Sequence, residues 1–233
     1  MTKEGQQISC TWKDEKICLD CKIVGRIHCR FSVKKWLFFA LNALPTMIIG
    51  IFGMVTIGLL TKKWWSLITY GGVVFVFWGL GLETLILCTH CPFYAEEGKT
   101  LRCLANTGLI KFWRYRPGPM NFFEKALLIV FFILMFGCPI GGTAYGVYFM
   151  AVNYTTYGLF ALLGMIGITG ATLLTTIQFF YILQYYFCPN CVNFSCPLNR
   201  VRKEIVDCYL QNNPVMKEAW EKTGYQLGEE ATN

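Results

Sequence analysis

Charged residues and histidine are scarce in this chain of 233 residues. Only 15% of the residues are charged and 55% are hydrophobic, whereas soluble domains carry roughly 25% charged residues. This composition excludes an ordinary soluble globular protein. The two histidines, His28 and His90, lie outside the long apolar runs, so we expect no haem b bound between membrane helices. The first 35 residues are polar and basic, and they do not resemble a cleavable signal peptide.

Long apolar runs contain most of the hydrophobic residues. Four of them exceed the length of about 20 residues that a helix needs to span a bilayer. They cover residues 36–60, 64–88, 126–150 and 157–187. Very short linkers join the first run to the second and the third to the fourth. The sequence therefore predicts an all-α integral membrane protein with four transmembrane helices in two helical hairpins. Two Gly-x3-Gly pairs, Gly137/Gly141 and Gly142/Gly146, predict close helix packing.

These runs divide the chain into five segments. They are a Cys-rich N-terminal metal-binding element (1–35), a first hairpin (36–88), a Cys-rich loop (89–124), a second hairpin (125–187) and a Cys-rich helical tail (188–233). With four spans, both termini and the loop lie on the same side of the membrane.

Lysine and arginine identify that side. Eight lie in the N-terminal segment, six in or next to the loop and five in the tail, which leaves only Lys62 and Lys63 for the opposite side. Because basic residues accumulate on the cytoplasmic side, we expect a multi-pass protein of the cell membrane with cytoplasmic N- and C-termini. Its partners would be the lipid bilayer and a soluble or membrane protein on the cytoplasmic face, not nucleic acid.

Ten of the 12 cysteines fall in the three segments expected on the cytoplasmic side, and an eleventh, Cys88, is the last residue of the first hairpin, next to the loop. The twelfth, Cys138, is interpreted as a packing residue. Cytoplasmic thiols stay reduced, so metal binding is favoured over disulfides. Each segment contains a Cys-x2-Cys pair, which offers two sulfurs to one metal from a single turn. The predicted metal ligands are Cys10, Cys18, Cys21, Cys29, Cys88, Cys91, Cys103, Cys188, Cys191, Cys196 and Cys208.

The three cysteine sets differ in completeness. The N-terminal set is regular, Cys-x7-Cys-x2-Cys-x7-Cys, and predicts one site with four ligands. The middle set has three cysteines; His90, an open iron or a ligand from another segment are the alternatives for its fourth position. Cys208 is either a fourth ligand of the C-terminal set or a buried packing residue.

The two hairpins also show an internal similarity. The second helix of each one runs directly into a Cys-x2-Cys pair, and each pair is followed by a Cys-x2-Asn motif. The matching motifs are Cys88/Cys91 with Cys103/Asn106, and Cys188/Cys191 with Cys196/Asn199. This pattern indicates a possible parallel duplication.

Several functions are compatible with these features. Four thiolates suit either iron–sulfur clusters or zinc, although the ferredoxin spacing of cysteines is absent. The first hypothesis is a membrane redox subunit that transfers electrons through iron–sulfur centres. The alternative is a zinc-stabilised membrane anchor or assembly scaffold. A third is a thiol-dependent membrane enzyme acting on a lipid or acyl substrate.

Glu83 is the only acidic residue within an apolar run. Ionisable groups are costly in a membrane and are often functional. Glu83 is therefore the candidate catalytic residue, as a proton relay or as a partner for an arginine of the central loop.

The layout resembles that of the Asp-His-His-Cys palmitoyltransferases, which have four spans and a cytoplasmic Cys-rich loop between the second and third. Thr89-His90-Cys91 is similar to the end of their signature. No aspartate precedes it, and the loop has too few cysteines for two zinc sites. The resemblance therefore covers only the layout.

Overall fold

The computed structural model describes residues 10–12, 18, 21–96 and 98–228, and within them it contains helices and turns but no strand. A single antiparallel bridge joins Thr100 to Ile110. The chain forms two compact units. Unit 1 comprises Met1–Trp36, Glu83–Ala126 and Leu183–Asn233, and unit 2 comprises Leu37–Leu82 and Leu127–Ile182.

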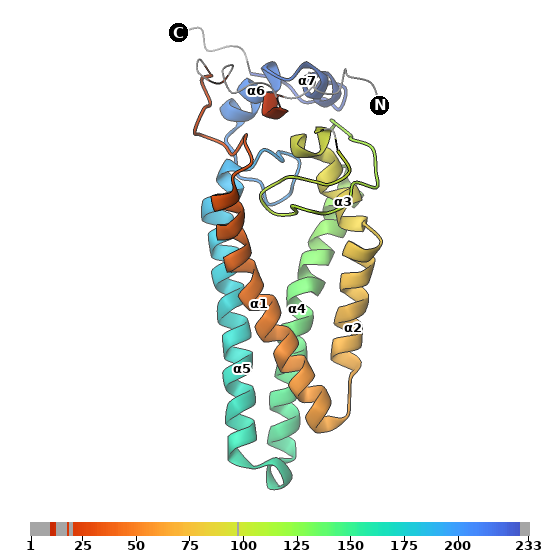
Figure 1. Ribbon diagram of the computed structural model, residues 1–233, viewed down its shortest axis with the longest axis vertical. Coiled ribbons are helices and arrows are strands. Elements are labelled where there is room, and N and C mark those ends of the chain that lie inside the picture. The colour runs from red at the N-terminus through yellow and green to blue at the C-terminus, as the bar shows by residue number, and fades with distance from the viewer. Residues whose placement is uncertain (1–9, 13–17, 19–20, 97, 229–233) are drawn as a thin grey trace. The chain divides into compact units, whose positions relative to one another are not determined.

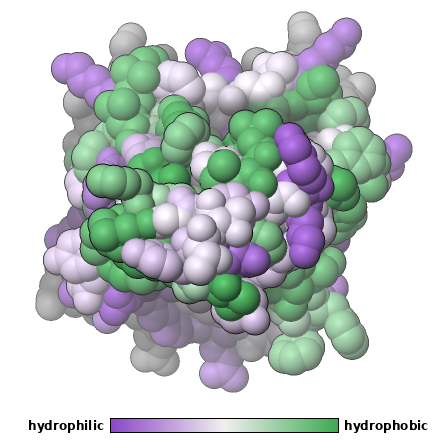
Figure 2. Space-filling view, turned by 90° about the horizontal axis from the view of Figure 1, so that it is seen from below, coloured by the Kyte–Doolittle hydropathy of each residue, from purple (hydrophilic) through white to green (hydrophobic). Residues whose placement is uncertain are grey.

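Unit 2 is built from long apolar helices (Figure 1). They are α1 (Val33–Thr61), α2 (Trp65–Val74) with the π-helical turn η4 (Phe75–Gly79), α4 (Phe122–Val152) and α5 (Tyr154–Ile182). Three helices are long and apolar enough to cross a membrane, or four if α2 and the helix that follows it count as one bent span. Large hydrophobic side chains face outward, and hydrophobic residues make up much of the surface in Figure 2. A membrane protein is therefore the natural interpretation.

The predicted second span is broken. After η4 the chain continues into the short helix α3 (Leu82–Ile86), and the two parts are bent by 47°. Gly81 lies at the break with a φ of 69°, a left-handed conformation that glycine adopts without steric cost. The length of the apolar run gave no sign of this break.

Glycines allow the helices of unit 2 to approach closely. A Cβ atom on Gly50 would lie 2.6 Å from the Pro139 ring, and one on Gly146 would lie 2.6 Å from Ile57. The predicted Gly142/Gly146 pair therefore lies where α4 packs closely against neighbouring helices. Gly137 and Gly141, the other predicted pair, have open space around them.

Unit 1 has its own hydrophobic core, to which all three of its segments contribute. Its buried residues include Ile23 and Ile27 from the N-terminal segment, Phe93 and Leu101 from the loop, and Val192, Tyr209 and Trp220 from the tail. The tail forms α6 (Lys203–Gln211) and α7 (Pro214–Glu221). Pro214 occupies the first turn of α7, where its missing N–H costs nothing.

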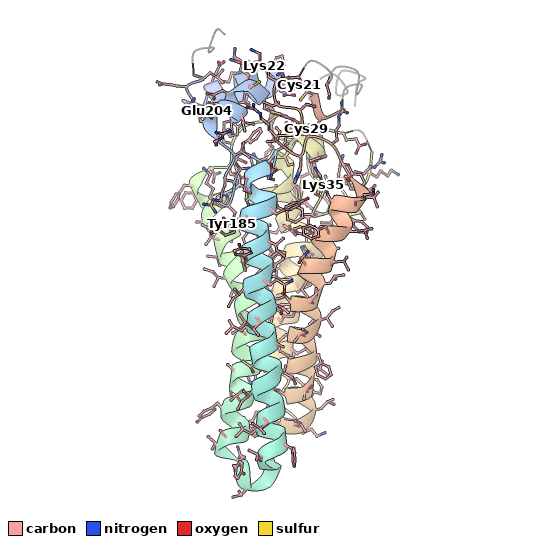
Figure 3. All side chains as sticks on the ribbon, turned by 90° about the vertical axis from the view of Figure 1, so that its left-hand side faces the viewer. Cys21, Lys22, Cys29, Lys35, Tyr185 and Glu204 are labelled. Atoms are coloured by element: carbon pink, nitrogen blue, oxygen red, sulfur yellow. The ribbon has the colours of Figure 1, made fainter. Side chains whose placement is uncertain are left out.

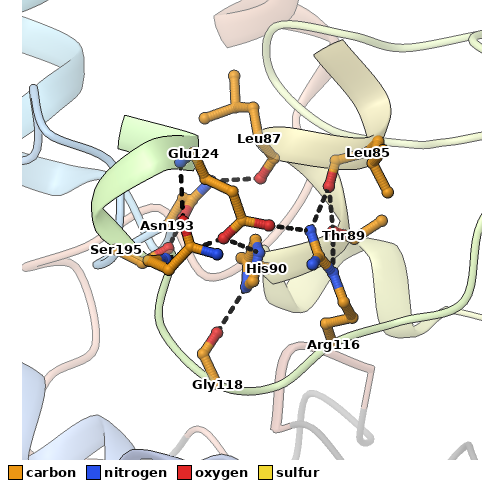
Figure 4. Close-up of polar contacts among 10 residues, drawn as sticks. Leu85, Leu87, Thr89, His90, Arg116, Gly118, Glu124, Asn193 and Ser195 are labelled. Carbon is orange, nitrogen blue, oxygen red and sulfur yellow. Dashed lines mark hydrogen bonds and ion pairs between the residues drawn. The ribbon is translucent and has the colours of Figure 1, made fainter. Parts of the chain in front are cut away.

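A polar network fixes the central loop (Figure 4). Asn121 and Glu124 exchange two hydrogen bonds of 2.9 Å at the start of α4, which is a capping box. Glu124 also pairs with Arg116 at 2.6 Å, and Arg116 donates to the carbonyl of Leu85 at 2.7 Å. The end of the loop is thereby attached to α3.

Candidate metal centres

The three Cys-x2-Cys pairs adopt the same turn. In each pair the N–H of the second cysteine donates to the carbonyl of the first. The N···O distances are 3.2 Å in the pair Cys18/Cys21, 2.9 Å in Cys88/Cys91 and 3.5 Å in Cys188/Cys191. This turn brings two cysteines of one short segment close together along the backbone, as a metal site requires.

The second and third turns also agree in their backbone angles. They form the 3-10 helices η5 (Cys88–His90) and η8 (Cys188–Asn190). The residues before them have φ/ψ of −93°/−51° and −88°/−51°, and the cysteines after them have −89°/135° and −84°/129°. The internal similarity of the sequence therefore extends to backbone conformation.

Backbone N–H groups oppose the effect of burial on four of these thiols. The N–H of Asn106 donates to Cys103 Sγ at 3.0 Å. Backbone N–H groups also lower the pKa of Cys91, Cys191 and Cys196, against the larger effect of burial, which raises it. Hydrogen bonds to the charged form of a group favour that form, and the thiolate is the form of cysteine that binds metal.

The charges of these four thiols also affect one another's pKa. Burial raises the pKa of the Cys91 thiol, and the charges of Cys191 and Cys103 raise it further. Burial likewise raises the pKa of Cys196 to about 12, with Cys191 as the strongest neighbouring charge. Thiols that raise each other's pKa in the absence of metal are neighbours that a bound cation would stabilise as thiolates.

A buried asparagine joins the two motifs. Asn193, between Cys191 and Cys196, is 5% exposed and donates from Nδ2 to the carbonyl of Leu87 at 2.9 Å. Ser195 in turn donates to Asn193 Oδ1 at 3.0 Å (Figure 4). The C-terminal cysteine loop is thereby attached to the residue that precedes Cys88.

The N-terminal cysteines form a second group, held by the tail. The N–H of Cys10 donates to Asn213 Oδ1 at 2.6 Å, and Asn213 Nδ2 donates to Cys10 Sγ at 3.3 Å. Arg30 donates to Cys18 Sγ at 3.3 Å. Burial raises the pKa of Cys29 to about 12, and the charges of Cys10 and Cys21 add to this effect. Cys21 and Cys29 are labelled in Figure 3.

Cys208 lies beside the N-terminal cysteines. Burial raises its pKa, and Cys21 is the strongest charge acting on it. It lies on α6 between the buried residues Asp207 and Tyr209. The sequence offered Cys208 either as a fourth ligand of the C-terminal set or as a buried packing residue.

Glu83 is buried and bound to an asparagine. It is 7% exposed, and Asn106 Nδ2 donates to its Oε1 at 2.7 Å. The same Nδ2 donates to Cys88 Sγ at 3.3 Å. The sequence predicted an arginine of the central loop as a partner, and the structure adds an amide of that loop. Asn106 was visible in the sequence only as part of the repeated Cys-x2-Asn motif, and no signal in the sequence pointed to Asn193 or Asn213.

His90 belongs to the polar network that fixes the loop. Its Nδ1 donates to the carbonyl of Gly118 at 2.6 Å, since a carbonyl only accepts. Its Nε2 lies 3.4 Å from Glu124, at ion-pair distance but without hydrogen-bond geometry. Both ring nitrogens therefore face this network.

Within the described residues, no three side chains of His, Cys, Asp or Glu are close enough to hold a single metal ion. Comparisons of the chain with protein-family models, curated proteins and solved structures gave no match. The chemistry of the site therefore has to be argued from its own residues.

Proposed function

We propose that this chain is a multi-pass membrane metalloprotein whose cysteine-ligated centres are iron–sulfur clusters, and that it transfers electrons between a protein partner and the membrane. The observation that carries the proposal is the set of N–H groups that donate to cysteine sulfurs. The backbone of Asn106 donates to Cys103 at 3.0 Å, its side chain donates to Cys88 at 3.3 Å, and the side chain of Asn213 donates to Cys10 at 3.3 Å. Such donors stabilise thiolates and tune the reduction potential of the iron they bind.

The proposed topology is that of a cell-membrane protein with its cysteines and both termini in the cytoplasm. Unit 1 contains the segments before, between and after the two apolar hairpins. A single compact unit of this kind requires that each hairpin return to the side from which it started. The excess of lysine and arginine in these segments supports a cytoplasmic location.

Anaerobic purification in detergent tests the proposal. We expect a brown protein that contains iron and acid-labile sulfide and gives an electron paramagnetic resonance signal when reduced with dithionite. Cys191→Ser should lower the iron content, while the matched variant Cys138→Ser in α4 should leave it unchanged. A colourless, iron-free preparation with stoichiometric zinc would rule out the redox function.

A zinc-stabilised anchor is the second candidate, and the N-terminal cysteines favour it. The segment that carries them reaches the tail through Asn213 and through a 2.7 Å hydrogen bond between Thr11 and Tyr209. A structural ion here would stabilise this attachment. In that case Cys18→Ala would reduce the yield of folded protein and would remove no redox signal.

A further inference from the structure

The second half of the central loop carries a segment that combines exposed aromatic and basic side chains. Residues 110–116, here called the aromatic segment, read Ile-Lys-Phe-Trp-Arg-Tyr-Arg. Phe112 is 60% exposed and Trp113 is 43% exposed, and Arg114 next to them is exposed as well. Adjacent exposed apolar side chains with polar neighbours are typical of a surface that binds another molecule or a membrane.

The fold holds the backbone of the aromatic segment in place. The N–H of Lys111 donates to the carbonyl of Lys99 at 2.8 Å, and the N–H of Trp113 donates to Tyr94 Oη at 3.0 Å. The exposure of the rings is therefore a property of an ordered backbone, and Lys99 lies beside the segment.

The last residue of the aromatic segment is bound to two apolar helices. The N–H of Arg116 donates to the carbonyl of Thr89 at 2.9 Å, and its guanidinium donates to the carbonyl of Leu85 at 2.7 Å. Both acceptors lie in the second part of the bent span, and Glu124, which pairs with Arg116 at 2.6 Å, lies in the first turn of α4. Since membrane helices end near the headgroups, these bonds place the segment at the bilayer surface.

Two further aromatic side chains begin α4. Phe122 is 78% exposed and Phe123 is 81% exposed, and their rings meet edge to face with centroids 5.9 Å apart. They are the first two residues of a helix that is long and apolar enough to cross a membrane. Lipid at the end of that helix would cover both rings, as it covers the aromatic belts of membrane proteins.

The charge around the aromatic segment suits an anionic partner. Residues 99–125 contain six lysines and arginines but a single acidic residue, Glu124, which Arg116 already binds. Among the described residues, neither Lys99 nor Arg114 forms an ion pair. Basic residues next to a membrane helix attract anionic lipids.

We propose that the aromatic segment, together with Phe122 and Phe123, lies in the bilayer interface, and that Lys99 and Arg114 bind the headgroups of anionic phospholipids there. The attachment of the segment to the ends of two apolar helices favours lipid over a soluble acidic protein as the occupant. This inference goes beyond the proposed function, because it involves no cysteine and holds whichever metal the protein contains.

The depth of Trp113 tests the first half of the proposal. The full-length protein and Trp113→Phe are placed in lipid nanodiscs, and the difference between their fluorescence isolates Trp113 from the other six tryptophans. We expect this signal to be quenched by phosphatidylcholine brominated near the headgroup end of its acyl chains and to resist aqueous iodide. Quenching by iodide alone would place Trp113 in water, and quenching by neither would place it against protein; either result overturns the proposal.

Lipid selectivity tests the second half. Electron paramagnetic resonance of spin-labelled lipids in the nanodiscs measures the preference of the protein for phosphatidylglycerol over phosphatidylcholine. Replacing Lys99 and Arg114 by glutamine should lower this preference by about fivefold per removed charge, which corresponds to about 1 kcal/mol for each basic residue. Arg114→Lys, which keeps the charge, should retain the preference.

The matched control removes the same net charge elsewhere, by replacing Lys217 and Lys222 of the tail with glutamine. It should keep the preference for phosphatidylglycerol. An equal loss in the control would show that only overall charge matters, and an unchanged preference in the Lys99 and Arg114 variant would show that these residues bind no lipid. Each of these results would overturn the proposal, and circular dichroism confirms that the compared variants are folded.

Discussion

The hydrogen bond between Asn106 and Glu83 provides a sharp test of the structure. Both groups belong to unit 1, and the bond of 2.7 Å supplies a donor to a carboxyl group that is only 7% exposed. A hydrogen bond to a charged group contributes about 1.5–3 kcal/mol, and the weaker bond from Asn106 to Cys88 adds about 0.5–1.5 kcal/mol. We expect Asn106→Ala to lower the free energy of unfolding by about 2–4 kcal/mol.

Exchanging donor and acceptor separates this bond from general packing effects. Asn106→Asp places two carboxyl groups together, and two charges 4 Å apart repel by about 4 kcal/mol at an effective dielectric constant of about 20. It should therefore destabilise the protein more than Asn106→Ala. Glu83→Gln combined with Asn106→Asp restores an amide–carboxyl bond, and should recover about 2 kcal/mol relative to Asn106→Asp alone.

Unfolding of the full chain by SDS in mixed micelles, followed by circular dichroism, measures these differences. The matched control is Asn199→Asp with Glu83→Gln, because Asn199 donates to the backbone carbonyls of Cys191 and Asn193. The control pair should be additive within about 0.5 kcal/mol. If the effects of Glu83→Gln and Asn106→Asp on the unfolding free energy were additive as well, the hydrogen bond between Glu83 and Asn106 would be refuted.

Three further predictions concern packing, pH and topology. Gly50→Ala should lower the unfolding free energy by about 1–3 kcal/mol in the same SDS titration, because the added Cβ would lie 2.6 Å from Pro139. Gly141→Ala is the control, because Gly141 has open space around it and the variant should unfold like the unchanged protein. Burial alone would raise the pKa of Asp207, but hydrogen bonds from Lys203, Tyr225 and Gly228 lower it below 3.8. Hydrogen-exchange protection of residues 224–228 should therefore be present above about pH 4, disappear as pH falls through the lowered pKa, and be weak at every pH in Asp207→Asn. A reporter that is active only outside the cytoplasm should work when inserted after Lys63 and fail at the C-terminus.

The sequence was sufficient to predict the helices but not their irregularities. Apolar runs of spanning length predict membrane helices reliably, because the bilayer core imposes both the length and the composition. The break near Gly81 depends instead on one backbone angle, which no hydropathy pattern records. The start of α7 at Pro214 was predictable, because proline at the first helical position follows from local chemistry alone.

The residue types of the candidate site could be predicted from the sequence, but which cysteines come together in the fold was harder to predict. Spacing along the chain groups cysteines that are near one another in the sequence, so it offered Cys208 as a fourth ligand of the C-terminal set or as a buried packing residue. In the fold α6 contacts the N-terminal segment, since Thr11 and Tyr209 share a hydrogen bond of 2.7 Å, and Cys208 and Cys21 pack against the same hydrophobic core. The hydrogen bond from Asn193 to Leu87 is likewise a tertiary contact, between residues 106 positions apart.

The two repeats share the arrangement of their thiols but differ around them. Glu83 lies five residues before Cys88, and the corresponding position before Cys188 is Leu183. Asn106 consequently donates to a carboxyl group, whereas its counterpart Asn199 donates to backbone carbonyls. Under the proposed metal-binding function, the ligands are the cysteines that both motifs contain, so Glu83→Gln should leave the metal content unchanged. Any step that requires this carboxyl group belongs to the first motif alone, and Glu83→Gln should impair that step without a loss of metal per chain.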